Sequence, residues 1–359
     1  MKRLILIAIA AFTACILCAC AGGGGVVETT ELPIIIGVKS NITVYEDDPQ
    51  ELILNALTDG VLTEGGKSFE VKYKILSRED GSEITELKAG HYDVRYYCDD
   101  PAIEVVKSSL TIKPADTTAP VFTGIKDLVV NLGQTVSYRE GVTVTDNDDT
   151  GITYTIDATK VDLTRLGLYE VTYTATDKRG NTTTVTAKVS VIEPLENGGD
   201  SPVCTREELD ALCRSILDDI ITPGMTDRQK AEAIYNRVYK IKYVSTEDDP
   251  NWVVNAWRGL TTNKGDCVNH SAASKALLTM AGIPNYQLER AGGTSDHYWL
   301  IVCIDGQWYH FDACPTSRKY PFQCFLKTDS EVKEYSDSRT DKPNYYGYDK
   351  ENCPYDVVD

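Results

Sequence analysis

Apolar and polar residues alternate in short runs over residues 32–193. In residues 169–175, tyrosine, valine, tyrosine and alanine alternate with glutamate and threonine. Such alternation predicts strands with one buried face and one wet face. The runs are rich in Val, Ile, Thr and Tyr, and Gly, Asp, Asn and Pro separate them. Together these features predict antiparallel β-sandwiches.

The β-rich region contains an internal repeat, because residues 84–96 align with residues 161–173. Both copies carry Gly-x-Tyr-x-Val-x-Tyr, at Gly90 and at Gly167. We therefore expect two tandem sandwiches, a divergent one at 32–115 and a second at 116–194. The second resembles the bacterial Ig-like modules of surface proteins. The resemblance is carried by residues 118–122, the acidic turn at 144–151, the Gly167 motif and residues 177–181. It implies a role in spacing or presenting another domain.

The periodicity changes after residues 195–202, whose Asn-Gly-Gly-Asp-Ser-Pro core predicts a linker. An apolar-periodic segment then runs from Thr205 to Ile221, with Glu208 placed for a capping box. A second begins at Thr226, with apolar residues three or four apart. Helices followed by strands predict an α+β domain over residues 203–359. The whole chain is thus predicted to be multidomain.

The N-terminus reads as an export signal. Lys2 and Arg3 precede an apolar stretch at 4–17 that is short for a membrane span. The ending Leu-Cys-Ala-Cys resembles a bacterial lipobox. This resemblance implies cleavage of a signal peptide at 1–19, a lipid on Cys20, and a Gly-rich tether at 20–31. The expected location is the extracellular face of a bacterial, Gram-positive, cell membrane, with plain secretion as the alternative.

Composition narrows the class of partners and ligands. The chain has 359 residues, 42% hydrophobic and 25% charged, with a net charge of −18. This acidity disfavours nucleic acid as a partner. Export permits disulfides, and the cysteines after residue 200 could form three bridges once one is set aside as a nucleophile. Residues 146–149 could bind calcium, although an acidic turn is the preferred interpretation. No metal or cofactor is predicted.

The chemistry is concentrated after residue 264. Cys267 follows a Lys-Gly-Asp loop and opens a predicted helix at 268–280, where the helix dipole favours a thiolate. Downstream, His297 and Asp312 lie on two predicted strands joined by an Asp305-Gly306 turn. Pairing those strands brings the imidazole and the carboxylate together at their far ends. Cys, His and Asp in these roles are a nucleophile, a base and an orienting group for acyl transfer.

Residues 226–314 resemble the transglutaminase-like superfamily. The matching segments are 227–235, 241–243, 265–267 with its Ala- and Leu-rich helix, 282–284, 297–299 and 305–312. The resemblance implies a papain-like α+β fold, with Cys267 as nucleophile, His297 as general base and acid, and Asp312 as orienting carboxylate. It favours hydrolysis of amide bonds in protein or cell-wall peptide over cross-linking. The alternative is an inactive surface adhesion or binding protein on an Ig-like stalk.

Four aromatic residues are further candidates for the cleft: Trp257, His270, Trp299 and His310. Trp257 could donate to an oxyanion, although a core role is the preferred interpretation. His270 is the main rival base because it lies one helical turn after Cys267. Cys314 could shape the site through a disulfide or respond to redox state. The segment after residue 323, including Tyr345-Tyr346-Gly347-Tyr348, shows no motif beyond a groove or an edge strand.

Overall fold

The computed structural model describes residues 33–65, 68–199, 201–292 and 295–359. The chain divides into two compact units, residues 1–117 and 118–359. The predicted signal peptide, Cys20 and the whole Gly-rich tether at 20–31 lie outside the described residues. No helix in the described part of the chain is long and apolar enough to cross a bilayer.

The first unit is a small β-rich module. Its main sheet has the order β2 (Asn41–Tyr45), β6 (Val106–Lys113), β5 (Gly90–Tyr97) and β4 (Lys72–Ser77), and a second pair joins β1 (Ile34–Ile36) to β3 (Leu62–Glu64). Helix α1 (Gln50–Thr58) adds Ile53 and Leu57 to the core. The sequence pattern predicted only strands here and missed this helix, whose two buried residues are four apart as one helical face requires.

The second unit begins with a sandwich of similar construction. One sheet has the order β10 (Tyr154–Asp157), β11 (Gly167–Thr176), β12 (Thr182–Ile192) and β8 (Leu128–Asn131), and β7 (Val121–Thr123) pairs with β9 (Thr143–Thr145). Val171, Tyr173 and Ala175 are buried, while their neighbours on β11 are more exposed. The alternation in residues 169–175 therefore marks the face that packs into this core.

The internal repeat in the sequence is also a repeat in structure. Tyr92 donates its hydroxyl to the carbonyl of Lys88 at 2.9 Å, and Tyr169 does the same to Arg165 at 3.0 Å. In both modules the tyrosine oxygen comes within 3.3 Å of where a Cβ on the preceding glycine would sit. This close approach explains why Gly90 and Gly167 head the repeated motif. In both, the last strand pairs antiparallel with its predecessor and parallel with an early strand.

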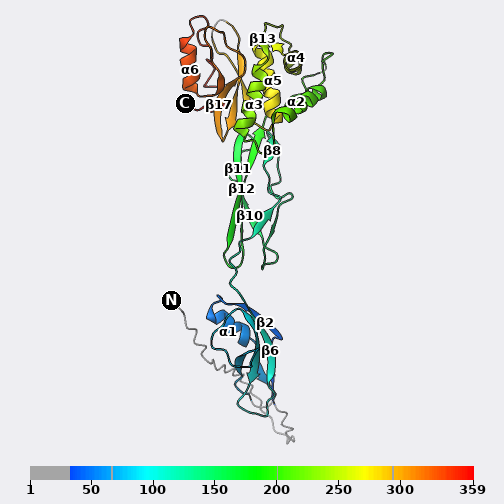
Figure 1. Cartoon of the computed structure of the whole chain (residues 1–359), viewed down its shortest axis with the longest axis vertical. Coiled ribbons are helices and arrows are strands. Elements are labelled where there is room, and N and C mark those ends of the chain that lie inside the picture. The colour runs from blue at the N-terminus through cyan, green and yellow to red at the C-terminus, as the bar shows by residue number, and fades with distance from the viewer. Residues whose placement is uncertain (1–32, 66–67, 200, 293–294) are drawn as a thin grey trace, which may run out of the picture. The chain divides into compact units, whose positions relative to one another are not determined.

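The rest of the second unit is α+β (Figure 1). Helices α2 (Arg206–Ile220), α3 (Asp227–Tyr239), α4 (Trp252–Thr262) and α5 (Cys267–Met280) precede a sheet of β15 (Asn285–Glu289), β16 (Tyr298–Ile304), β17 (Gln307–Asp312) and β18 (Cys324–Lys327), which α6 (Asp329–Ser338) follows. A short parallel pair joins β13 (Lys242–Tyr243) to β14 (Lys264–Gly265). Thr205 and Glu208 form the predicted capping box of α2.

Both faces of this sheet are buried. Leu300, Val302 and Ile304 of β16 pack against helices α2 to α5. The alternate residues Trp299 and Ile301 pack into an aromatic cluster built largely from the C-terminal segment. Strand β16 is therefore almost continuously apolar, as a strand covered on two sides must be.

The sandwich of the second unit is packed against its α+β part. Leu166 is 3% exposed and belongs to the aromatic cluster of the C-terminal segment. Next to it, Arg165 donates to the carbonyl of Pro354 at 2.5 Å. Lys275 of α5 pairs with Glu193, just after β12, at 2.8 Å. The sandwich and the α+β part of residues 118–359 are thus joined by direct contacts.

The expected disulfides do not occur in the described part of the chain. Its eight cysteines, Cys98, Cys204, Cys213, Cys267, Cys303, Cys314, Cys324 and Cys353, are all free. Six of them are buried, and all of these except Cys314 belong to the apolar clusters, where they fill space as small apolar side chains. The prediction of three bridges was wrong because export and an even count permit pairing but do not bring sulfur atoms together.

Candidate active site

The start of helix α5 is built to present Cys267. Asp266 is the N-cap, and its carboxylate accepts the backbone N–H of Val268 at 3.1 Å. Asn269 completes the capping box by accepting the N–H of Asp266 at 3.1 Å. A Cβ on Gly265 would lie 2.5 Å from that of Asn269, so only glycine allows the strand to approach the helix here. The Gly-Asp-Cys motif therefore fixes the first turn of α5.

The loop before α4 ties this turn down from the other side. Thr246 donates both its backbone N–H and its hydroxyl to the Asp266 carboxylate, at 3.2 and 2.7 Å. Asn269 in turn donates to the carbonyl of Asn255 at 3.0 Å. Cys267 thus begins a helix whose end is cross-bonded to two neighbouring segments.

The thiol of Cys267 is protonated at neutral pH in the resting site. Burial raises its pKa to about 11, opposed by the backbone N–H of Tyr298, and the charges of Asp266, Asp312 and Asp248 raise it further. From the sequence alone, the dipole of the helix is expected to favour the thiolate. Burial and acidic neighbours outweigh that effect, so a base must remove the proton before the sulfur can attack.

The predicted base and orienting carboxylate are hydrogen-bonded to each other. His297 Nε2 lies 2.8 Å from Asp312 Oδ2, and the two residues are only 3% and 4% exposed. Asp312 ends β17, and its other oxygen accepts the N–H of Cys314 at 2.9 Å. In the described part of the chain no group hydrogen-bonds Nδ1 of His297. The bond to Asp312 places the ring proton on Nε2 and leaves Nδ1 as an acceptor.

The C-terminal segment completes the surroundings of this pair. Tyr346 donates its hydroxyl to Asp312 Oδ2 at 2.9 Å, and the ring of Tyr345 lies 4.7 Å from that of His297. Arg290 donates to the carbonyl of Tyr345 at 2.9 Å and lies over its ring. Sequence reasoning missed these tyrosines. Their clustering with Gly347 was visible, but no spacing related them to residues more than thirty positions earlier.

His270 cannot be the base, although it lies on the same helix as Cys267. It is 1% exposed, and its Nδ1 and Nε2 face the carbonyls of Asp266 at 2.6 Å and Ile241 at 3.1 Å. Both ring nitrogens therefore have backbone partners. His270 joins the start of α5 to the segment between α3 and β13, which is a structural role.

The other three cleft candidates pack against or within the protein core. Trp257 of α4 is half-buried and packs against the helical core, in agreement with the core interpretation. Trp299 and His310 are 1% and 0% exposed, and Trp299 donates to His310 at 3.0 Å. Both lie behind the His297–Asp312 pair, where neither can line a cleft for substrate.

One backbone donor at the helix start is available for an oxyanion. The N–H groups of Val268, Asn269 and His270 are taken by Asp266. Among the described residues, none accepts the N–H of Cys267 itself. An oxyanion formed by attack of its sulfur would lie close to this group, which is where such a donor is useful.

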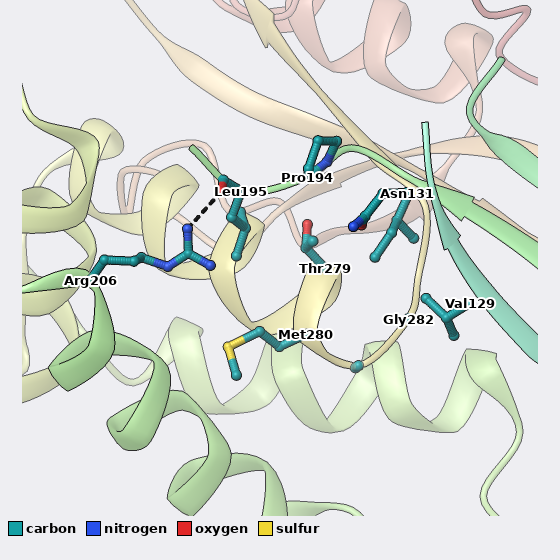
Figure 2. Close-up of a pocket in the computed structure, with 10 residues that line it drawn as sticks. Val129, Asn131, Pro194, Leu195, Arg206, Thr279, Met280 and Gly282 are labelled. Carbon is teal, nitrogen blue, oxygen red and sulfur yellow. Dashed lines mark hydrogen bonds between the residues drawn. The ribbon is translucent and has the colours of Figure 1, made fainter. Parts of the chain in front are cut away.

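A pocket of about 460 Å³ lies at the opposite end of α5 (Figure 2). It is lined by Val129 and Asn131 of β8, by Ile192, Pro194 and Leu195, by Arg206, and by residues 279–282. Its one charged side chain is already satisfied, because Arg206 bonds the carbonyls of Leu195 and Glu196 and the carboxylate of Asp210. This pocket is a seam between packed segments, away from Cys267.

The acidic turn of the second sandwich is held by its own contacts. Asp146 accepts the N–H groups of Asp148 and Asp149 at 3.0 Å, and Asp149 pairs with Lys178 at 2.9 Å. These bonds fit the preferred interpretation of residues 146–149 as a turn. Calcium binding there stays an untested hypothesis.

Comparisons with known proteins agree with this architecture. Residues 214–313 match the model of the transglutaminase-like superfamily, and residues 121–191 match the bacterial surface protein Ig-like domain. An uncharacterized 81.3 kDa protein of Acholeplasma phage L2 is 26% identical over 169 residues, covering 45% of this chain and 22% of its own length. The chain thus spans about a fifth of that relative.

Among solved structures, a transglutaminase shares 19% identity over 34% of this chain and 38% of its own, with a TM-score of 0.26. A protein from Cytophaga hutchinsonii proposed to be a cysteine protease shares 17% identity over 47% and 67%, with a TM-score of 0.25. Cadherin domains of protocadherin gamma B7 share 14% identity over 45% of this chain and 51% of their own, with a TM-score of 0.21. These sequence identities and TM-scores are too low to add support to the two family matches. This chain carries a domain of the transglutaminase-like superfamily behind a bacterial surface Ig-like domain.

Proposed function

We propose that the chain is a thiol acyl-transfer enzyme that cleaves amide bonds of protein or cell-wall peptide through Cys267, His297 and Asp312. The observation that carries the proposal is the 2.8 Å bond from His297 Nε2 to Asp312, which leaves Nδ1 as an acceptor. The superfamily match over residues 214–313 supports a cysteine-based enzyme. An inactive binding protein would have no need to leave one nitrogen of a buried, carboxylate-bonded imidazole without a partner.

In the first half of the reaction, Nδ1 of His297 takes the proton of the Cys267 thiol. The thiolate attacks the carbonyl carbon of the substrate amide, and the N–H of Cys267 contributes to binding the oxyanion. The imidazolium then gives its proton to the amide nitrogen. The C–N bond breaks, the amine leaves, and a thioester remains on Cys267. Asp312 holds the imidazole in the required tautomer and stabilises its charged form.

In the second half, water gives a proton to His297 and its oxygen attacks the thioester carbonyl. The C–S bond breaks, the sulfur recovers its proton, and a carboxylic acid is released. An amine in place of water would give a cross-link by the same steps. We favour water, as the resemblance to bacterial members of the superfamily implies.

The test is covalent trapping with an electrophilic peptide library, read by mass spectrometry on Cys267. Wild type should form an adduct, and Cys267→Ala should form none. Cys353→Ala is the matched control, because Cys353 is the other half-exposed cysteine of the described residues and lies in the C-terminal segment. Labelling of Cys353 in place of Cys267 would refute the proposal. Water and amine are then separated by comparing ammonia release from a glutaminyl peptide with incorporation of a fluorescent alkyl amine.

The site is held at the outer face of the membrane by a lipid on Cys20, with the two sandwiches as spacers. Support comes from the lipobox-like Leu-Cys-Ala-Cys sequence and from the match to a surface Ig-like domain. Growth with a clickable fatty acid should label the wild-type chain. Cys20→Ala should lose the label, whereas Cys18→Ala should keep it. Label retained in Cys20→Ala would leave secretion as the better hypothesis.

A further inference from the structure

A second histidine–carboxylate pair lies directly behind the candidate active site. His310 is on β17, two residues before Asp312, and is fully buried. Trp299 donates its indole N–H to Nδ1 of His310 at 3.0 Å, so the proton of the neutral ring lies on Nε2. Nε2 then donates to Asp329 Oδ1 at 2.8 Å. Both ring nitrogens are engaged, so His310 cannot exchange protons with a substrate.

The carboxylate that His310 bonds, Asp329, is held in place by the C-terminal segment. Asp329 is the first residue of α6, and Tyr348 donates to it at 2.9 Å while Lys350 forms an ion pair with it. Burial works against its charge. The bonds from His310, Lys350 and Tyr348 nevertheless lower the pKa of Asp329 to about 2. The carboxylate is therefore ionised across the physiological range and holds His310 firmly.

At its other end, this series of hydrogen bonds holds Trp299, which stacks on the imidazole of His297. The indole of Trp299 lies against the imidazole of His297, with ring centroids 5.6 Å apart and planes 22° apart. The direction of its N–H is set by His310, so His310 fixes the plane against which His297 rests. Ordinary core packing would need no such arrangement, because burying an indole N–H, an imidazole and a carboxylate costs free energy that apolar side chains would avoid.

We propose that His310 and Asp329 are positioning residues for His297, acting through the indole of Trp299. This role rests on the Cys267–His297 chemistry proposed above. The C-terminal segment then sets the base in two ways. Tyr346 bonds Asp312 directly, and Asp329 orients the ring stack through His310. A displaced imidazole would remove the thiol proton less efficiently, since catalysis is sensitive to misplacements of about 1 Å.

The test measures the rate of alkylation of Cys267 by iodoacetamide between pH 5 and 10, per folded molecule. His310→Phe keeps a ring but loses both hydrogen bonds. We expect its rate at neutral pH to fall about tenfold, and the remaining reactivity to move toward alkaline pH, where the thiol ionises without help. Asp329→Asn keeps an acceptor for Nε2 of His310 and should therefore retain most of the wild-type alkylation rate. Tyr309→Phe, on the same strand, should match wild type.

If His310→Phe does not fold, Trp299→Phe tests the same series of hydrogen bonds. It keeps a ring against His297 but removes the N–H that His310 receives, and the same fall and alkaline shift are expected. A folded His310→Phe or Trp299→Phe with the wild-type rate and pH profile would overturn the role. So would a loss that merely follows the unfolded fraction. A wild type no faster than His297→Ala would instead refute the proposed function itself.

Discussion

His297, just before β16, and His310, on β17, each bond a carboxylate at 2.8 Å, yet they are suited to different tasks. His297 uses one ring nitrogen for Asp312 and keeps the other for chemistry. His310 has both nitrogens occupied, by Trp299 and by Asp329. The comparison teaches that a buried histidine–carboxylate pair is not a sign of catalysis. The state of the second nitrogen decides whether the ring can move a proton.

The largest expected difference between the pairs lies in the reactivity of Cys267. His297→Ala should lower the rate of Cys267 alkylation at neutral pH by about 10³-fold, because removing a general base costs this much and burial keeps the pKa of the thiol at about 11. His310→Phe should cost only about tenfold. His91→Ala changes an exposed histidine of the first module and should have no effect. An equal fall in the alkylation rate for His297→Ala and His310→Phe would contradict the different roles assigned to the two histidines.

Stability should depend on the pair that does no chemistry. The folded pKa of Asp329, about 2, lies below its ordinary 3.8, so its stabilisation is full above about pH 5 and is lost as pH falls through about 2. With the side chain 13% exposed, we expect roughly 2 kcal/mol from it at pH 7. Denaturant unfolding of wild type and Asp329→Asn should differ by that amount at pH 7 and converge near pH 2. A constant difference would contradict the assignment.

The smallest difference is expected between two tyrosine hydroxyls that lie at the same distance from the two carboxylates. Tyr346 donates to Asp312 and Tyr348 to Asp329, each at 2.9 Å. Tyr346→Phe should lower the alkylation rate about tenfold, since a hydrogen bond to a charged group contributes about 1.5–3 kcal/mol. Tyr348→Phe should change it by less than about threefold, because Asp329 keeps His310 and Lys350. A reversed order would place the working pair at His310.

Local signals in the sequence were sufficient for one half of this site. Asp305 and Gly306 both adopt positive φ, 52° and 79°, so the predicted two-residue turn sets the register that brings His297 beside Asp312. The Asp266 cap likewise starts α5 at Cys267, one residue before the predicted helix. In both places the turn or cap chemistry of a few adjacent residues determines the geometry.

The other half could not be predicted, because it depends on packing between distant segments. Tyr346 reaches Asp312 across 34 residues, and Asp329 meets His310 because β18 runs back antiparallel to β17 and places Lys327 opposite His310. The ionisation of Cys267 was misjudged for the same reason. The helix N-terminus was visible in the sequence, whereas the burial and the acidic neighbours that raise the thiol pKa were not.

The contact of Leu166 with the C-terminal aromatic cluster has a practical consequence for anyone who shortens this chain. A fragment that starts at the linker near residue 203 would lack Leu166 and Arg165, and Tyr355 would lose the guanidinium that lies over its ring. The same cluster carries Tyr345 and Tyr346, which surround His297. An isolated catalytic fragment should therefore be less soluble and less active than residues 118–359. The Ig-like sandwich would then be a necessary companion of the enzyme rather than a removable spacer.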